Sequence, residues 1–158
     1  MEQKIITAEE VLAEAFTDGE YIAANVIAHS DIAAAIERWI LPITGHELLE
    51  AIEAGSYPEF TSQYLKPTIA AYTRLEIQPR LNVATGQLGL SLPRTSYHKV
   101  ADESMRRELM TALKRRAYML RRRMSSHLDK HAEEMPEYDP KRNILKRCCC
   151  NGGIVQVH

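Results

Sequence analysis

The chain has 158 residues, 45% of them hydrophobic, which suits one domain with a real core and excludes a globally disordered chain. The formal net charge of −1 hides an asymmetry, because residues 1–79 carry 13 acidic and 4 basic side chains whereas residues 80–158 carry 8 acidic and 16 basic ones. Such a split indicates that the halves neutralise each other, within a chain or between copies, or that one half meets an acidic partner.

Targeting and redox signals are weak in this sequence. The N-terminus MEQKIITAEE has neither the basic region nor the apolar region of a signal peptide, and no apolar run approaches a membrane span, so we expect no membrane contact. The three cysteines are consecutive, at 148–150, and fit neither a disulfide framework nor a zinc site. They indicate a reducing compartment and incidental thiols, with crosslinking of neighbouring copies as the alternative.

Capping signals predict the first two helices. Thr7 and Glu10 have the spacing of a capping box, and they open a short helix that ends near residues 17–19. Ser30 and Asp31 begin a second helix, in which isoleucines recur every four residues. We expect Pro42 to end it, because proline removes a helical hydrogen bond and its ring clashes with the preceding turn.

Two further helices follow before residue 82. Thr44 and Glu47 form another capping box, and Gly55 is suited to the position just after the C-terminus of that helix. Pro58 suits the first turn of the next helix, which we expect to kink or break at Pro67 and to be interrupted again at Pro79. Residues 82–99 then lose helical periodicity, and their glycines predict a long loop or a small hairpin.

One long helix is predicted from about Asp102 to Ala132, with apolar residues three or four apart that form a single stripe. The stripe consists of Met105, Leu109, Leu113, Ala117, Leu120, Met124 and Leu128. The prolines at 136 and 140 end helical structure. We therefore expect an all-α fold, a helical bundle over residues 1–135 followed by an extended C-terminal tail over 136–158.

Five bases of the long helix share an arc of about 120°, which we place opposite the apolar stripe. They are Arg107, Lys114, Arg115, Arg121 and Arg122. Such a face has three possible interpretations. It is a solvated surface that pairs with acids of the N-terminal half, or it contacts a partner protein or a neighbouring copy, or it contacts nucleic-acid phosphates. The near-zero net charge and the lack of interleaved aromatic residues disfavour a dedicated nucleic-acid reader.

Catalytic signals are not recognised in the sequence. His127 and His131 have the i, i+4 spacing of two metal ligands, but no carboxylate or cysteine at a standard spacing completes a set, so we interpret them as partly buried packing residues. No phosphate loop, nucleophile elbow or Cys/His dyad is recognised either. We expect a protein that is not an enzyme and that holds no metal or cofactor.

The C-terminal tail ends in a short apolar segment that follows two glycines. Ile154, Val155 and Val157 alternate as in a β-strand, and such a strand can dock on a partner's sheet edge. Packing on its own domain and disorder are the alternatives.

Six segments, in their order and spacing, carry a resemblance to a known family. They are residues 5–12 (IITAEEVL), 39–45 (WILPITG), 72–80 (YTRLEIQPR), 137–140 (EYDP), 143–145 (NIL) and 152–157 (GGIVQV). Together they resemble the small helical head–tail connector (adaptor) proteins of tailed phages, in the form found in Bacteroidetes phages and prophages. The resemblance extends over essentially the whole chain.

The resemblance implies a structural virion protein without enzymatic activity. Such adaptors form a homo-oligomeric ring under the portal protein, around the channel that DNA crosses, and they join the portal to neck and tail proteins. The resemblance also implies an all-helical fold, docking by loops and the C-terminal tail, and nonspecific contact with double-stranded DNA. The protein would lie at the head–tail junction of the virion, and in the cytoplasm of the bacterial host before assembly. A nucleic-acid-binding accessory protein, such as a small DNA-packaging or regulatory subunit, is the alternative function.

Overall fold

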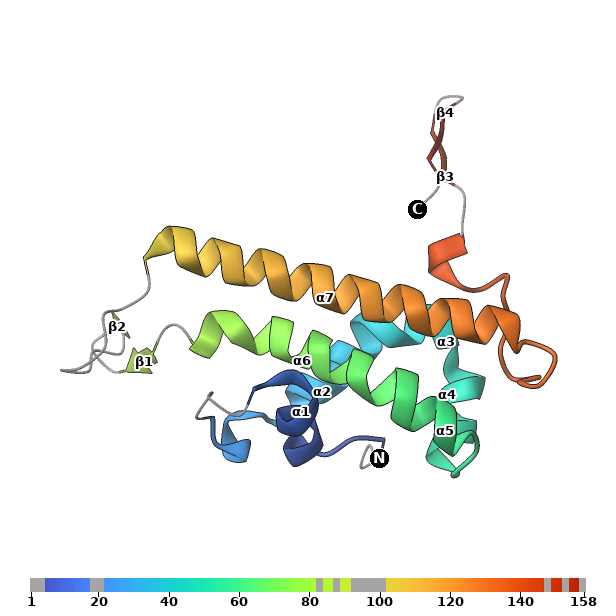
Figure 1. Ribbon diagram of the computed structural model, residues 1–158, viewed down its shortest axis with the longest axis horizontal. Coiled ribbons are helices and arrows are strands. Elements are labelled where there is room, and N and C mark those ends of the chain that lie inside the picture. The colour runs from blue at the N-terminus through green and yellow to red at the C-terminus, as the bar shows by residue number, and fades with distance from the viewer. Residues whose placement is uncertain are drawn as a thin grey trace.

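A computed structural model of the chain describes residues 5–17, 22–81, 84–86, 89–91, 102–146, 149–151 and 154–156. The predicted all-α class is confirmed, since helices build the body of the molecule and each of the four strands in the described ranges has only three residues (Figure 1). In the described part of the chain, no helix is long and apolar enough to cross a membrane.

The first helix, α1 (Ala8–Ala15), begins with the predicted capping box. The Thr7 amide donates to the Glu10 carboxylate at 2.9 Å, and the Glu10 amide donates to the Thr7 hydroxyl at 3.2 Å. A short 3-10 turn, η1 (Ala24–Val26), precedes α2 (His29–Ala35). The Asp31 carboxylate accepts the Ala28 amide at 2.9 Å, so α2 begins one residue before the predicted Ser30.

The prediction that Pro42 ends this helix is wrong. Helical backbone continues through a π-helical turn, η2 (Ile36–Ile40), into α3 (Leu41–Thr44), and Pro42 lies in the first turn of α3. The Leu41 amide donates to the Ile36 carbonyl oxygen, a step of five residues rather than four. We infer that this wider turn leaves room for the proline ring and uses no amide that Pro42 would have to supply.

The second predicted capping box, at Thr44 and Glu47, does not form. The Thr44 hydroxyl instead donates to the Ile40 carbonyl oxygen at 3.2 Å, one turn back in the same helix. Gly45, at a φ of 79°, makes the sharp corner before α4 (His46–Glu53) and takes the capping position that the prediction assigned to Thr44. At the other end of α4 the prediction is confirmed, because Gly55 has a φ of 97° and follows the last helical turn.

The next helical segment shows the same relation between a π turn and a proline. Pro58 begins α5 (Pro58–Phe60), as predicted, and a second π turn, η3 (Thr61–Leu65), leads into α6 (Lys66–Leu81). The kink or break expected at Pro67 therefore takes the form of a π turn, η3, which ends two residues before this proline. Pro79 does not interrupt α6, which continues to Leu81.

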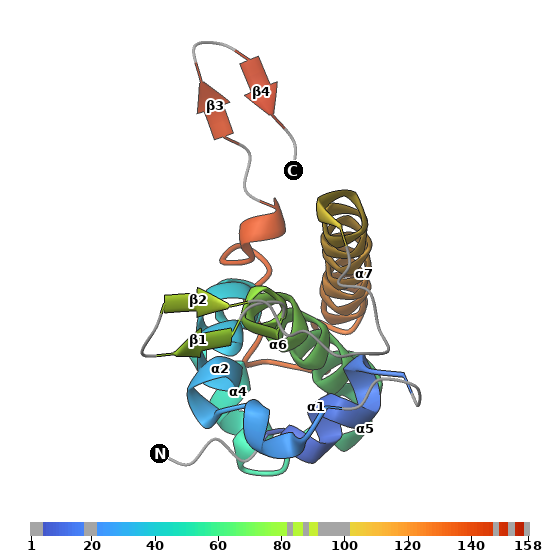
Figure 2. The ribbon, with the colours of Figure 1, turned by 90° about the vertical axis from the view of Figure 1, so that its left-hand side faces the viewer.

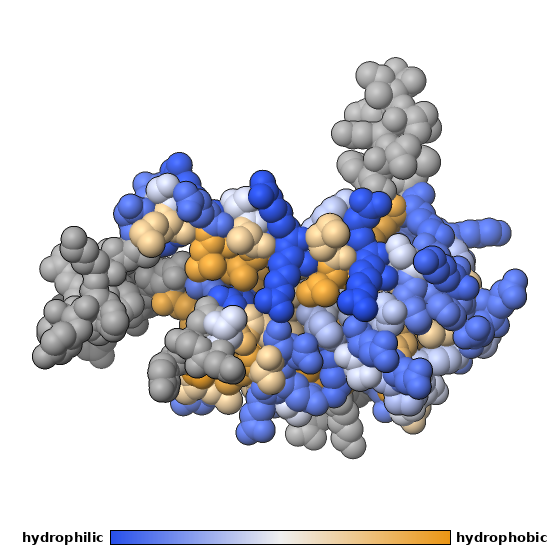
Figure 3. Space-filling model, viewed as in Figure 1, coloured by the Kyte–Doolittle hydropathy of each residue, from blue (hydrophilic) through white to orange (hydrophobic). Residues whose placement is uncertain are grey.

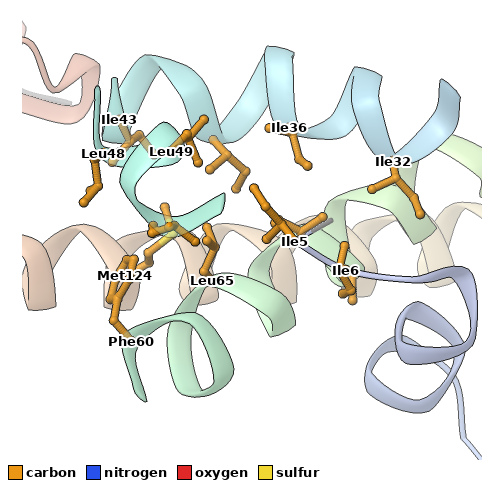
Figure 4. Close-up of a cluster of buried hydrophobic side chains, with 14 of the residues drawn as sticks. Ile5, Ile6, Ile32, Ile36, Ile43, Leu48, Leu49, Phe60, Leu65 and Met124 are labelled. Carbon is orange, nitrogen blue, oxygen red and sulfur yellow. The ribbon is translucent and has the colours of Figure 1, made fainter. Parts of the chain in front are cut away.

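Helix α6 is the centre of the fold, because it packs against α1, α2 and α7. Nine of its sixteen residues are buried, including the polar Arg74 and Gln78. Figure 2 shows α7 on one side of α6 and α2 and α4 on the other. Side chains from all of these layers meet in one hydrophobic core, from Ile5 at the N-terminal end to Met124 of α7 (Figure 4).

The long predicted helix is α7 (Glu103–Lys130), and the Asp102 carboxylate caps it by accepting the Met105 amide at 2.8 Å. The apolar stripe is covered only from Leu113 onward. Met105 is 60% exposed and Leu109 37% exposed, whereas Leu113 and Met124 are buried. The first two turns of α7 therefore extend beyond the core.

The segment after α7 folds back onto the helix before the tail begins. Tyr138 and Asn143 are buried against the domain, and a 3-10 turn, η4 (Ile144–Lys146), follows. Residues 136–146, predicted as the first part of the tail, thus pack on the bundle.

Two small antiparallel hairpins complete the described structure. Within the predicted loop, β1 (Ala84–Gly86) pairs with β2 (Gly89–Ser91). In the tail, β3 (Cys149–Asn151) pairs with β4 (Ile154–Gln156), with Cys150 opposite Val155. One edge of the predicted terminal strand is therefore occupied by its own chain.

Candidate interaction surfaces

The predicted basic residues of α7 separate into an exposed group and one covered member. Arg107, Lys114, Arg115 and Arg122 are exposed. Arg107 pairs with Glu103, one turn earlier in α7. Where the structure describes the chain, no acid of residues 1–79 forms an ion pair with any of the five bases. In the described part of the chain, the acids of the N-terminal half therefore do not neutralise this face.

Arg121 is the covered member, and the prediction that it lies opposite the apolar stripe is wrong. Its guanidinium carbon lies 5.5 Å from the ring centre of Trp39, 5.8 Å from that of Tyr72 and 5.6 Å from that of Tyr118. On a helical wheel Arg121 is only about 40° from Ala117, at the edge of the stripe. Trp39 and Tyr72 reach that edge from η2 and α6 and cover part of the side chain, which is half-buried.

These aromatic rings line a hollow of about 480 Å³ between η2, α6 and α7. Trp39 and Tyr72 stack with their ring centres 4.8 Å apart, and burial raises the pKa of the Tyr72 hydroxyl. The Glu76 carboxylate accepts the Trp39 indole N–H at 2.8 Å and an Arg38 N–H at 3.2 Å, and it thereby fixes the indole in the wall.

The hollow is cationic. Arg38, Lys114 and Arg121 line it against the single carboxylate of Glu76. Among the described residues, the buried Nε–H of Arg121 has no hydrogen-bond partner. Because guanidinium and ammonium groups bind carboxylates and phosphates, this hollow suits an anionic group.

The outer side of α7, away from the core, forms a ridge of mixed character. Arg115, Met119 and Arg122 follow one another at i, i+4 and i+7, and we call these three residues the α7 ridge. Met119 is 64% exposed, the largest exposed fraction among the exposed large hydrophobic side chains of the described chain. Figure 3 shows hydrophobic surface between hydrophilic side chains on the face over which α7 runs. Methionine and arginine are both enriched at protein interfaces, so the α7 ridge suits contact with another protein.

The opposite side of the molecule has an acidic counterpart. Between α2, η2, α3 and α4 lies a hollow of about 330 Å³, which we call the acidic groove. Its apolar lining is Ala33, Ile36, Leu41 and Leu49, and its polar lining is Glu37, His46, Glu50 and Glu53. Glu37, Glu50 and Glu53 are exposed, and in the described parts of the chain none of the three has an ion-pair partner.

His127 of α7 stacks on His131, the residue that follows the last turn of this helix. The His127 ring lies 4.1 Å from the rings of both His131 and Tyr64, and the His131 Nδ1 is 2.9 Å from the His127 carbonyl oxygen. Burial lowers the pKa of His127. Over the described residues, no group of three or more potential ligands is placed to hold a metal ion. The column of rings explains the histidines as packing residues.

The predicted docking residues of the tail are only partly placed. Ile154 and Val155 lie in β4, and Val157 lies outside the described residues. Their role in docking stays a prediction. The sequence reasoning missed Met119, although an apolar residue on the basic side of the wheel was a usable signal. It also missed the acidic groove, for which the sequence has no local signal.

A family model matches residues 25–147, well over half of the chain, and it is described as a family of unknown function (DUF6712). The chain belongs to this family. No curated protein and no solved structure matches it. The matched residues of this DUF6712 member run from η1 to η4, so they contain the α7 ridge, the cationic hollow and the acidic groove, and they leave out α1.

Proposed function

We propose that this protein is a structural virion subunit, a head–tail connector that assembles into a homo-oligomeric ring under the portal protein and joins it to neck and tail components. The observation that carries the proposal is the α7 ridge. A single copy leaves Met119 in water and leaves Arg115 and Arg122 without an acidic partner in the described chain. Contact with another protein would remove that apolar surface from water and pair those charges.

The distribution of charge supports a ring in particular. Bases lie on α7, whereas the acids of the groove that have no ion-pair partner in the described chain lie on η2 and α4. Figure 2 shows α6 between α7 and α4. A surface that differs from its partner surface makes head-to-tail contacts, and such contacts close into rings when the rotation between copies permits. The order of the six segments that resemble phage adaptors supports the same function. The protein would act in the host cytoplasm before assembly and at the head–tail junction afterwards, without catalysis.

The test is the assembly state in the presence and absence of the portal protein of the same phage or prophage. Native mass spectrometry and negative-stain microscopy at high protein concentration should detect rings, either of the protein alone or templated on the portal. A protein that stays monomeric and has no affinity for the portal would refute the proposal.

The exposed bases of α7 favour one second candidate, a nucleic-acid-binding accessory protein. A dedicated DNA-binding function predicts tight binding to double-stranded DNA with a steep salt dependence, because each phosphate contact releases counterions. Replacing Arg115, Arg121 and Arg122 with alanine should then abolish binding, whereas Lys141→Ala should not. If no binding is measured at low salt, this candidate is excluded. Weak, salt-sensitive binding fits the passage of DNA through a connector ring.

A further inference from the structure

The α7 ridge and the acidic groove are complementary in chemistry. The ridge presents one apolar side chain, Met119, between Arg115 and Arg122. The groove presents the half-buried Ala33 and Leu41 beside three glutamates, and the buried Ile36 and Leu49 complete its apolar lining. Each surface has the charge that the other lacks, and each has an apolar centre.

We propose that the α7 ridge of one copy docks in the acidic groove of a second copy. Met119 packs against Ala33 and Leu41, and the two arginines pair with Glu37, Glu50 and Glu53 of that copy. This inference rests on the proposed function and specifies the contact that builds the ring. It commits to a second copy because the charges of the ridge and of the groove are opposite and both belong to the same chain.

The placement of the two surfaces allows every copy to use both at once. Figure 2 shows α7 on one side of α6 and α2 and α4 on the other, so a copy docked on the ridge does not cover the groove. The contact is therefore head to tail rather than two-fold symmetric, and it continues from copy to copy. Arginine suits the pairing, since its planar guanidinium binds a carboxylate through two parallel hydrogen bonds.

The experiment reverses the charge on each surface separately. The groove variant carries Glu50→Lys and Glu53→Lys, and the ridge variant carries Arg115→Glu and Arg122→Glu. In either variant alone, ridge and groove have like charges, and we expect self-association to weaken by at least about 100-fold, measured by sedimentation velocity. In an equal mixture of the two variants each ridge meets a groove of opposite charge, so assembly should return, with the two variants alternating in native mass spectra.

Matched controls reverse charges that lie outside both surfaces. The exposed residues for this purpose are Glu133 and Lys141, and neither Glu133→Lys nor Lys141→Glu should change assembly. Met119→Ser should weaken assembly without any change of charge, while Met105→Ser, at another exposed methionine of α7, should not. Circular dichroism of every variant checks that the helices are intact.

The outcomes separate the interface from the function. If the wild type assembles and the reversals leave it unchanged, or if mixing the variants restores nothing, the interface is wrong and the connector proposal stands. If the wild type neither assembles nor binds the portal, both proposals are overturned. Alternation in the mixture supports the interface, because assembly then depends on opposite charge between the two surfaces.

Discussion

Asn143 holds the segment after α7 against the bundle by hydrogen bonds, and replacing it with alanine should lower the free energy of unfolding. Its side chain is fully buried. The amide nitrogen donates to the Ser125 hydroxyl and to the Tyr138 hydroxyl, each at 2.8 Å, and the amide oxygen accepts the Leu145 backbone amide at 2.9 Å. Asn143→Ala removes all three hydrogen bonds.

The magnitude follows from the number of hydrogen bonds and from burial. A typical intramolecular hydrogen bond contributes about 0.5–1.5 kcal/mol net, so three of them amount to roughly 3 kcal/mol. The Tyr138 hydroxyl still donates to Asp129 at 2.7 Å, which limits the loss on that side. We expect the free energy of unfolding to fall by about 2–4 kcal/mol, which corresponds to a Tm lower by roughly 5–15 °C for a chain of this length.

The assay is urea denaturation followed by circular dichroism at 222 nm, with Asn25→Ala as the control at an exposed asparagine. Asn25→Ala should change the free energy of unfolding by less than about 0.5 kcal/mol. A loss below about 1 kcal/mol for Asn143→Ala would refute the view that this residue fastens the segment by buried hydrogen bonds. If Asn143→Ala instead keeps the free energy of unfolding of the wild type and loses portal binding, this residue acts by positioning the tail rather than by stabilising the fold.

Two further perturbations test particular features of the fold. Because burial lowers the pKa of His127, the neutral ring is favoured in the folded state, so its contribution to stability should be complete above a pH of about 6.5 and fall as the pH drops through that value. The variant His127→Phe keeps the stack with Phe60 and Tyr64, and its unfolding midpoint should fall less than that of the wild type between pH 7.5 and pH 5. An equal fall in both proteins would contradict this explanation. Gly55→Ala forces an L side chain to a φ of 97° and should lower the free energy of unfolding, measured with denaturant, by about 1–2 kcal/mol, whereas Gly55→Asn should lower it by less. If neither variant changes the free energy of unfolding, the turn after α4 relaxes to accommodate the side chain.

Some features that are satisfied within three or four residues could be predicted from the sequence, although the capping box expected at Thr44 does not form. The capping box at Thr7 and the glycine turn at 55 form as expected, since each needs only its immediate neighbours. The extent of α7 could also be predicted, because the apolar periodicity runs along the whole helix and prolines follow it. The central place of α6 was not predicted, because a helix that is buried on most sides has no clear polar face to read.

The candidate surfaces could be predicted only in part. Exposure of Arg115 and Arg122 follows from the helical wheel of α7 alone. The enclosure of Arg121 does not, because it depends on Trp39 and Tyr72 arriving from two other helices. The acidic groove likewise joins residues from α2 to α4 that no periodic pattern links.

The π turn η2 connects the fold to both candidate surfaces. A π turn places one more residue in a turn than an α-helix does, so the residues that follow are rotated by about 100° from the direction that an uninterrupted helix would give them. Around this turn, Glu37 lines the acidic groove whereas its neighbours Arg38 and Trp39 line the cationic hollow. Adjacent residues therefore contribute opposite charges to two different surfaces. Pro42, in the first turn of α3, favours the π turn itself, because an unbroken α-helix at Pro42 would place its ring against the Arg38 carbonyl group. The turn that accommodates the proline is thus the same turn whose residues line both the acidic groove and the cationic hollow.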